Sequence, residues 1–286
     1  MDIVASLNAR AHALIFALVV LVIAFIAKKA DDWRTSKFDD DDEIANKGNL
    51  AVGIRRAGLL LGGIVAIAGA LGGQSGGLLS DLVNVAAYGT AGYALLFAAR
   101  FVCDKVTLNT IDDDDEIAKG NVAVGIVEFG TLLAIGIVLN GAMTGDDADL
   151  LHGLRGMAVF FVIAQAVLVL TGFIYQKVTP FNDQEELGRD NRAVAVEFAG
   201  MYLGTALIVR GCLVGPSSGF KYDLYAFGLG VATGVALLFA FQFLLRRAFL
   251  HKAKLNQALR DGNVAVAVTL QALTIAFAYL IATVVV

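Results

Sequence analysis

Proline, cysteine and charge are scarce in this sequence of 286 residues. It has two prolines and two cysteines, and Asp, Glu, Lys and Arg make up 17% of it, against about a quarter in soluble domains. Hydrophobic residues make up 58%, and the mean hydropathy is +0.72. A composition so poor in charge excludes an ordinary soluble domain and indicates a chain that lies in lipid.

Motifs that carry chemistry in many enzymes are also missing. The sequence has no GxGxxG, P-loop, serine-elbow or CxxC motif, and the spacing of His12, His152 and His251 suits neither a haem pair nor a zinc triad. Cys103 and Cys212 fall at opposite ends of the predicted spans, so we expect them to pack as small apolar side chains rather than to bridge. We therefore expect no enzyme, no cofactor, no specific metal site and no nucleic-acid partner. The net charge of -4 indicates no particular partner.

Long apolar runs, in contrast, fill most of the chain. A transmembrane helix needs about twenty such residues, and the first run is too long for a signal peptide and lacks a convincing cleavage site. The sequence therefore predicts an all-α polytopic membrane protein with eight transmembrane helices. The predicted spans are residues 12–28, 50–71, 79–103, 121–143, 151–176, 192–214, 222–245 and 263–286.

Lys and Arg are distributed unevenly about these spans. The loops 29–48, 104–120, 177–190 and 246–262 and their flanks hold most of them, whereas the opposite side has little beyond Arg10, Arg155 and Lys221. Because positively charged loops stay in the cytoplasm, we expect these four loops to be cytoplasmic and both termini to lie outside.

A short motif recurs four times along the chain at nearly even intervals. It begins at an asparagine in NLAVGI, NVAVGI, NRAVAV and NVAVAV. Each copy joins one helix, a polar loop and a second helix opened by the Asn, which predicts four parallel two-helix repeats. The four asparagines are Asn49, Asn121, Asn191 and Asn263.

A second, longer period spans two of these repeats. At this offset GYALLFAARF (92–101) matches GVALLFAFQF (234–243), Glu43 matches Glu185 and Asp81 matches Asp223. We therefore expect two four-helix blocks, 1–147 and 148–286, related by a pseudo-two-fold rotation around the membrane normal. Glycines such as Gly58 and Gly62, one helical turn apart, predict close helix packing.

Tandem four-helix blocks whose helices open with a G-N-x-A-V-[GA] step resemble the YjfL-type bacterial inner-membrane proteins, a domain-of-unknown-function family (number 350). The resemblance covers nearly the whole chain. It implies a bacterial cytoplasmic (inner) membrane protein whose family has envelope-stress and polyamine-related neighbours but no established activity. The second block departs from the pattern, with NDQEELGRDN and LNQALRDGN in place of the tetra-Asp run.

The asparagines and four charges inside the spans are the candidate site residues. An Asn before an apolar helix caps its free N–H groups; the alternative is a ring of amides that faces a central path. Arg55, Arg56, Glu128 and Glu197 lie six or seven residues past an Asn. Since unpaired charge is costly there, we expect Arg55 or Arg56 to pair with Glu128 or Glu197, either as structural salt bridges or as a functional polar layer.

Two acid runs, from Asp39 to Glu43 and from Asp112 to Glu116, lie on the predicted cytoplasmic side. They lack the spacing of a calcium loop and have two interpretations. One is a solvated segment that starts a helix; the other is a docking strip for polyamines, divalent cations or a basic protein.

The leading functional hypothesis is therefore a passage or binding site for a small polar or cationic solute at the repeat interface. The alternative is a membrane scaffold whose acidic cytoplasmic loops recruit a stress-response or polyamine-pathway partner. A continuous polar tunnel would favour passage.

Overall fold

The computed structural model describes residues 3–35, 37–72, 76–144, 149–179, 181–215, 218–248 and 255–284. Within these ranges the chain is all-helical, and eight helices are long and apolar enough to cross a membrane, as the sequence predicted. These are α1 (Ile3–Arg34), α3 (Leu50–Ala70), α4 (Leu78–Val106), α6 (Val122–Met143), α7 (Leu150–Val178), α9 (Arg192–Leu213), α10 (Phe220–Ala248) and α12 (Val264–Val284).

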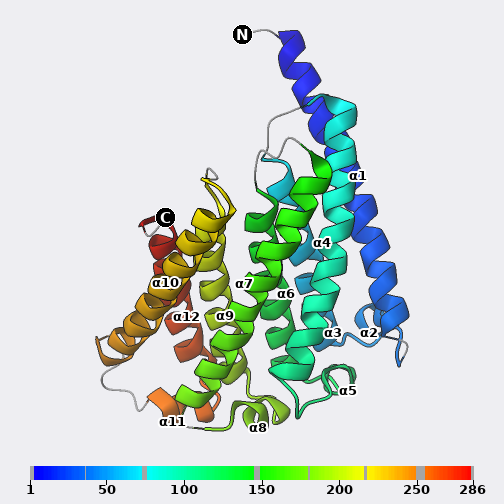
Figure 1. Cartoon of the computed structure of the whole chain (residues 1–286). Coiled ribbons are helices and arrows are strands. Elements are labelled where there is room, and N and C mark those ends of the chain that lie inside the picture. The colour runs from blue at the N-terminus through cyan, green and yellow to red at the C-terminus, as the bar shows by residue number, and fades with distance from the viewer. Residues whose placement is uncertain are drawn as a thin grey trace.

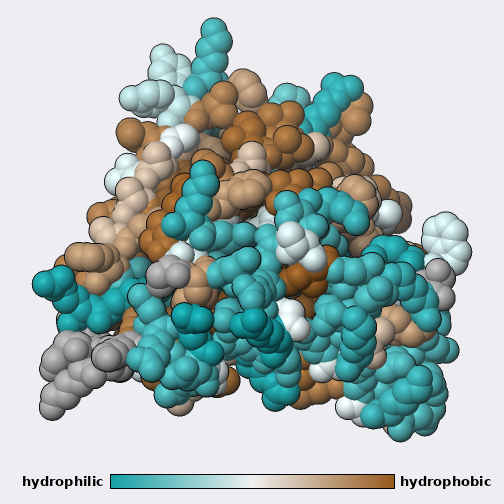
Figure 2. All heavy atoms as spheres, turned by 90° about the horizontal axis from the view of Figure 1, so that it is seen from below, coloured by the Kyte–Doolittle hydropathy of each residue, from teal (hydrophilic) through white to brown (hydrophobic). Residues whose placement is uncertain are grey.

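Four short helices lie in the polar loops, where the sequence predicted at most a helix start. Each connects the two long helices of one repeat, and all four lie at the same end of the molecule (Figure 1), which we call the loop face. Hydrophilic side chains cover much of this end, seen from below in Figure 2. The short helices are α2 (Asp40–Ala45), α5 (Asp113–Ala118), α8 (Asp183–Gly188) and α11 (Leu255–Arg260).

The second long helices of the repeats form one continuous row. α3 packs against α6, α6 against α9, and α9 against α12. The first long helices cover this row: α4, α7 and α10 each pack against two consecutive row helices, and α1 packs against α3 and α4. Four equivalent repeats therefore follow one another side by side (Figure 1).

This row corrects one expectation from the sequence. A two-fold axis that exchanged the halves would map the contact between α6 and α9 onto a contact between α12 and α3. Instead, α3 and α12 lie at opposite ends of the row (Figure 1), with α6 and α9 between them. The repeat is confirmed, but the pseudo-two-fold rotation is wrong, because the contact between the halves is of the same kind as the contact within each half.

Glycine allows the row helices to touch at their backbones. A Cβ at Gly136 of α6 would lie 2.1 Å from the carbonyl oxygen of Gly62 in α3, and a Cβ at Gly62 would lie 2.4 Å from the carbonyl oxygen of Leu132. Close approach through small residues is a usual way for helices to associate in lipid. The predicted packing role is thus confirmed for Gly62.

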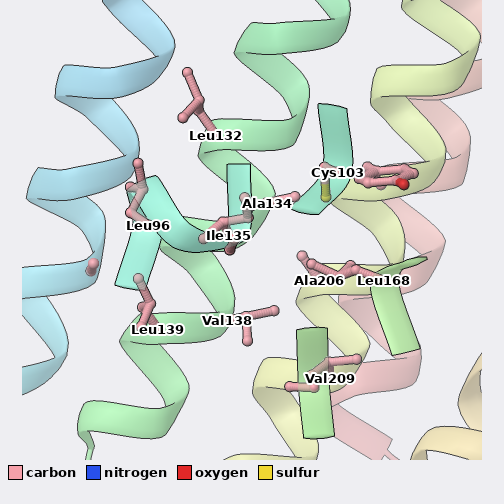
Figure 3. Close-up of a cluster of buried hydrophobic side chains, with 14 of the residues drawn as sticks. Leu96, Cys103, Leu132, Ala134, Ile135, Val138, Leu139, Leu168, Ala206 and Val209 are labelled. Atoms are coloured by element: carbon pink, nitrogen blue, oxygen red, sulfur yellow. The ribbon is translucent and has the colours of Figure 1, made fainter. Parts of the chain in front are cut away.

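The centre of the molecule is apolar. Figure 3 shows Leu96 of α4 beside Leu132, Ile135 and Leu139 of α6, and Leu168 of α7 near the α9 side chains. Residues of α6 and α9 are mostly buried, whereas α1 and α10 expose many large apolar side chains, which suits contact with lipid. The two cysteines are free, as predicted.

The longer period is confirmed in detail at the ends of the helices away from the loop face. Asp81 accepts a hydrogen bond from the backbone N–H of Gly76, and Asp223 accepts the equivalent bond from Ser218, both at 2.9 Å. Each aspartate thereby holds the turn that begins its helix. The expected block boundary at residues 147 and 148, and His251, lie outside the described residues.

Candidate functional site

The four motif asparagines cap the four row helices, as predicted. The Oδ1 atoms of Asn49, Asn121, Asn191 and Asn263 each accept a hydrogen bond from a backbone N–H in the first turn of the helix that follows. The residue before each Asn has a positive φ, and three of the four are glycine, which adopts this conformation without strain. The fourth is Asp190, with φ of 58°.

The same side chains also join neighbouring repeats. Asn49 Nδ2 donates to the carbonyl of Ile117 at 3.1 Å, and Asn121 Nδ2 donates to the carbonyl of Leu187 at 2.9 Å. Asn191 Nδ2 repeats the pattern with Leu259 at 3.0 Å. Each accepting carbonyl lies near the end of the next repeat's short helix. The amides therefore lie in a row at successive interfaces and do not form the ring that would face a central path.

A glutamate in each of the first three repeats accepts a second hydrogen bond from the Asn amide. Its partner is Glu43 for Asn49, Glu116 for Asn121 and Glu186 for Asn191, at 3.0, 3.1 and 2.8 Å. The structural counterpart of Glu43 is therefore Glu186, one residue beyond the Glu185 that the longer period predicted. The first loop has one extra residue between the Glu and the Asn, which shifts the match.

Arg55 and Arg56 find partners other than those expected. Both contact the carboxylate of Asp40, the first residue of α2; Arg56 also contacts Asp32, and Arg55 Nη1 lies 3.2 Å from Asp114 Oδ1. Neither arginine forms an ion pair with Glu128 or Glu197, so that prediction is wrong. Long guanidinium side chains reach towards the polar end of a membrane helix, where α1 and the short helices supply carboxylates.

Glu128 of α6 and Glu197 of α9 instead pair with arginines of the long helices α4 and α10. Arg100 Nε of α4 lies 2.6 Å from Glu128 Oε2, and Arg246 of α10 contacts Glu197. Both glutamates and Arg100 are buried. In the sequence, Arg100 and Arg246 belong to the positive charges in and beside the loops, and their spacing from the glutamates does not indicate a contact.

Arg100 also connects the first two repeats. Its Nη1 lies 3.2 Å from Asp31 Oδ1 of α1, whose other oxygen lies 3.5 Å from Arg55. Asp31 and Arg55 are fully enclosed by protein. Buried charge is costly unless it is paired, and the charges of this network are paired through ion pairs that they share with one another. Loss of one partner from such a pair costs about 3–5 kcal/mol.

Most acids of the two runs cap a short helix or form an ion pair within the protein. Asp39 and Asp112 cap α2 and α5 by accepting backbone N–H groups, and Asp114 pairs with Arg34 at 3.2 Å. The helix-starting interpretation is confirmed for both runs. Other members of the runs have lysine partners, including Asp41 with Lys28, Asp115 with Lys37, Glu43 with Lys47 and Glu116 with Lys119.

The first residue of each acid-led short helix is buried. Asp40, Asp113 and Asp183 occupy this position in α2, α5 and α8, and none is more than 6% exposed. Burial, with the carboxylate of Glu128 nearby, raises the pKa of Asp113 to about 8. Burial also raises the pKa of Asp183 to about 7, although a hydrogen bond from Thr179 opposes the shift.

Open grooves lie on the loop face where successive repeats meet. One groove of about 440 Å³ separates α5 and the loop before it from α8. A larger groove of about 910 Å³ separates α8 from α11 and has both acidic and basic side chains in its wall. The smaller groove is lined by Thr110, Ile111, Asp112, Glu116, Asn182, Gln184, Glu185 and Gly188.

Comparison with known proteins identifies the family to which each four-helix block belongs. The model of the family described as Domain of Unknown Function (DUF350) matches residues 3–147 and again residues 149–285. These two matches correspond to the two four-helix blocks expected from the sequence. No solved structure matches the chain.

Relatives occur in distant bacteria. A UPF0719 transmembrane protein of Aquifex aeolicus is 21% identical over 65% of this chain and 69% of its own length. The UPF0719 inner membrane protein YjfL of Escherichia coli K12 is 29% identical over 31% of this chain and 65% of its own. The UPF0719 transmembrane protein YshE of Bacillus subtilis is 28% identical over 46% of this chain and 92% of its own. With eight apolar spans and two successive family matches, the chain belongs to the Domain of Unknown Function (DUF350) family of integral membrane proteins, of which it contains two tandem copies.

Proposed function

We propose that this protein binds a small cationic solute on its loop face, at the interface between successive repeats. The observation that carries the proposal is the smaller groove, whose described wall contains the carboxylates of Asp112, Glu116 and Glu185 and no basic residue. The unequal distribution of Lys and Arg favours a cytoplasmic position for this face. An elongated polyamine has the charge and shape that such a groove would accept.

The groove carboxylates are available for exchange of partners. Asp112 pairs with Lys37 at 3.2 Å, Glu116 with Lys119 at 2.7 Å and Glu185 with Arg189 at 2.5 Å, and these basic side chains are largely exposed. Exposed ion pairs of this kind contribute about 0–1 kcal/mol each. A soluble polycation can therefore displace the lysines and arginine at small cost.

Close packing favours binding over passage between the row helices. At the level of Gly62 and Gly136 the backbones of α3 and α6 are in contact, which leaves no space there for a hydrated ion. Binding to the groove is thus the better-supported interpretation.

The test is a titration of spermidine into the purified full chain in detergent, in which isothermal titration calorimetry measures the binding at two salt concentrations. Glu116→Gln with Glu185→Gln should weaken binding at least tenfold, since a loss of about 1.4 kcal/mol already gives a factor of ten. Wild-type binding should weaken as salt is raised, because salt screens exposed charges.

Asp42→Asn is the control for this titration. Asp42 belongs to the first acid run, lies outside the groove and contacts Lys47 in the same manner. Its loss should leave the affinity for spermidine within about twofold of wild type, a change of less than about 0.5 kcal/mol. Equal affinity in all three proteins, or no binding at all, would exclude the groove. Capture of a soluble protein that is lost in the same double variant would favour the scaffold.

A further inference from the structure

Three carboxylates from three helices converge just inside the loop face. They belong to Asp104 of α4, Asp113 of α5 and Glu128 of α6, and one oxygen of each lies within 4.8 Å of the other two. Asp113 and Glu128 are 6% and 1% exposed, and the Asp104 side chain is 21% exposed. Carboxylates at such distances repel one another strongly in a poorly solvated site.

The first repeat shows how the same arrangement is neutralised by a side chain. Asp32 and Asp104 occupy equivalent positions in the first two repeats, and Asp40 and Asp113 both begin a short helix. In the first repeat the guanidinium of Arg56 contacts both Asp32 and Asp40. Counted from the motif asparagine, the residue of the second repeat that corresponds to Arg56 is Glu128. The second repeat therefore keeps both aspartates and replaces the cation between them with a third acid.

Arg100 compensates only part of this charge. It lies 2.6 Å from Glu128 and 3.7 Å from Asp104, and it is shared with Asp31 and Asp114. Asp113 has no ion pair within the described ranges, and its buried Oδ1 accepts no hydrogen bond there. When all three carboxylates are ionised, one guanidinium leaves two negative charges, and an uncompensated buried charge of this size is costly.

We propose that Asp104, Asp113 and Glu128 bind one divalent metal cation of the class that prefers carboxylate oxygen, such as Mg²⁺ or Mn²⁺. One such ion balances the two excess charges. Ligand bonds of about 2.0–2.2 Å place opposite oxygens about 4.2 Å apart, a separation that the cluster accommodates. The ion takes the place that the Arg56 guanidinium holds in the first repeat. This site is separate from the solute groove and does not depend on it.

Two classes of variant test the proposal. Asp113→Asn removes one ligand, and its matched control is Asp115→Asn, an exposed acid of the same helix that pairs with Lys37. Glu128→Arg recreates the first repeat by placing a guanidinium between the two aspartates. It serves as the second variant should Asp113→Asn fail to fold.

Mn²⁺ is the probe, added to the full chain in detergent after treatment with a chelator. Binding is followed by electron paramagnetic resonance, and the thermal unfolding midpoint is recorded with and without the ion. We expect one Mn²⁺ per wild-type chain, together with a raised midpoint because the ion binds the folded state. Asp115→Asn should behave as wild type, and Asp113→Asn should bind at least 100-fold more weakly. Glu128→Arg should bind no Mn²⁺ at this site and unfold at one temperature in both conditions.

Three results would overturn the proposal. They are no Mn²⁺ bound by the wild type at millimolar concentration, equal binding by the wild type and the two cluster variants, and equal loss of binding in Asp115→Asn. The first would mean that protons shared among the carboxylates neutralise the cluster. The second and third would mean that Mn²⁺ binds only to surface acids.

Discussion

Asn121 of α6 donates a hydrogen bond from Nδ2 to the carbonyl of Leu187, 2.9 Å away at the end of α8, while its Oδ1 caps its own helix. One side chain thus begins a transmembrane helix and fixes the position of the next repeat. Asn263 occupies the equivalent position at the end of the row, where it is exposed. Among the described residues, its side chain caps α12 and makes no bond to another repeat.

Asn121→Ala should therefore destabilise the protein more than Asn263→Ala. Loss of a cap costs about 1 kcal/mol, and Asn121→Ala also leaves buried hydrogen-bonding groups unpaired, which adds about 1–3 kcal/mol. The midpoint of unfolding in a titration with sodium dodecyl sulfate measures both variants. Equal losses would show that the bond between repeats contributes nothing.

The pair of Glu197 and Arg246 provides a second prediction. Glu197 is 1% exposed, and Arg246 is its one ion-pair partner within the described part of the chain. Arg246→Met should lower the free energy of unfolding by about 3–5 kcal/mol, because a buried carboxylate loses its counterion. Glu197→Leu combined with Arg246→Met should recover most of the lost free energy of unfolding. A double variant as unstable as the single one would contradict a purely structural pair.

Asp183 should make stability depend on pH. Its pKa rises from an ordinary value of 3.8 to about 7 in the folded protein, because burial disfavours the charged form. Between about pH 4 and pH 7 the folded state therefore binds more protons than the unfolded state, so stability falls as the pH rises through this window, by at most about 1.4 kcal/mol per pH unit.

Asp183→Asn removes this titration and can still accept the hydrogen bond from Thr179. Its unfolding midpoint should vary less with pH than that of the wild type, and the variant should be the more stable of the two above pH 7. Measurement at pH 5, 6, 7 and 8 decides the matter, and parallel pH profiles of the two proteins would refute the assignment to Asp183.

Both termini are expected outside the cytoplasm, because Lys and Arg concentrate on the loop face. Alkaline phosphatase fused to either end should be active, and a fluorescent protein fused at the loop between α4 and α6 should fold in the cytoplasm. Phosphatase that is inactive at either terminus would reverse the orientation and place the solute groove outside.

Much of the architecture followed from local patterns. Apolar run length predicted the eight spans, and the recurring Asn predicted both the repeats and the caps, because a cap depends on residues two or three positions away. The acid runs showed a limit of such patterns. Four consecutive aspartates from Asp112 to Asp115 are alike in sequence, yet Asp113 is buried and Asp115 is exposed, since the turn of α5 directs each one differently.

Sequence by itself determined the class, the spans and the repeat of this protein, because hydrophobic length and helix capping are local properties of the chain. Tertiary structure alone decided that the repeats form a row and which charges meet. Arg55 contacts Asp40 rather than Glu128, and Glu128 contacts Arg100, because each ion pair joins different helices whose relative positions depend on backbone contacts such as that between Gly62 and Gly136. Depth along a helix measures how far a charge lies from water, but only the packing of the other helices determines its partner.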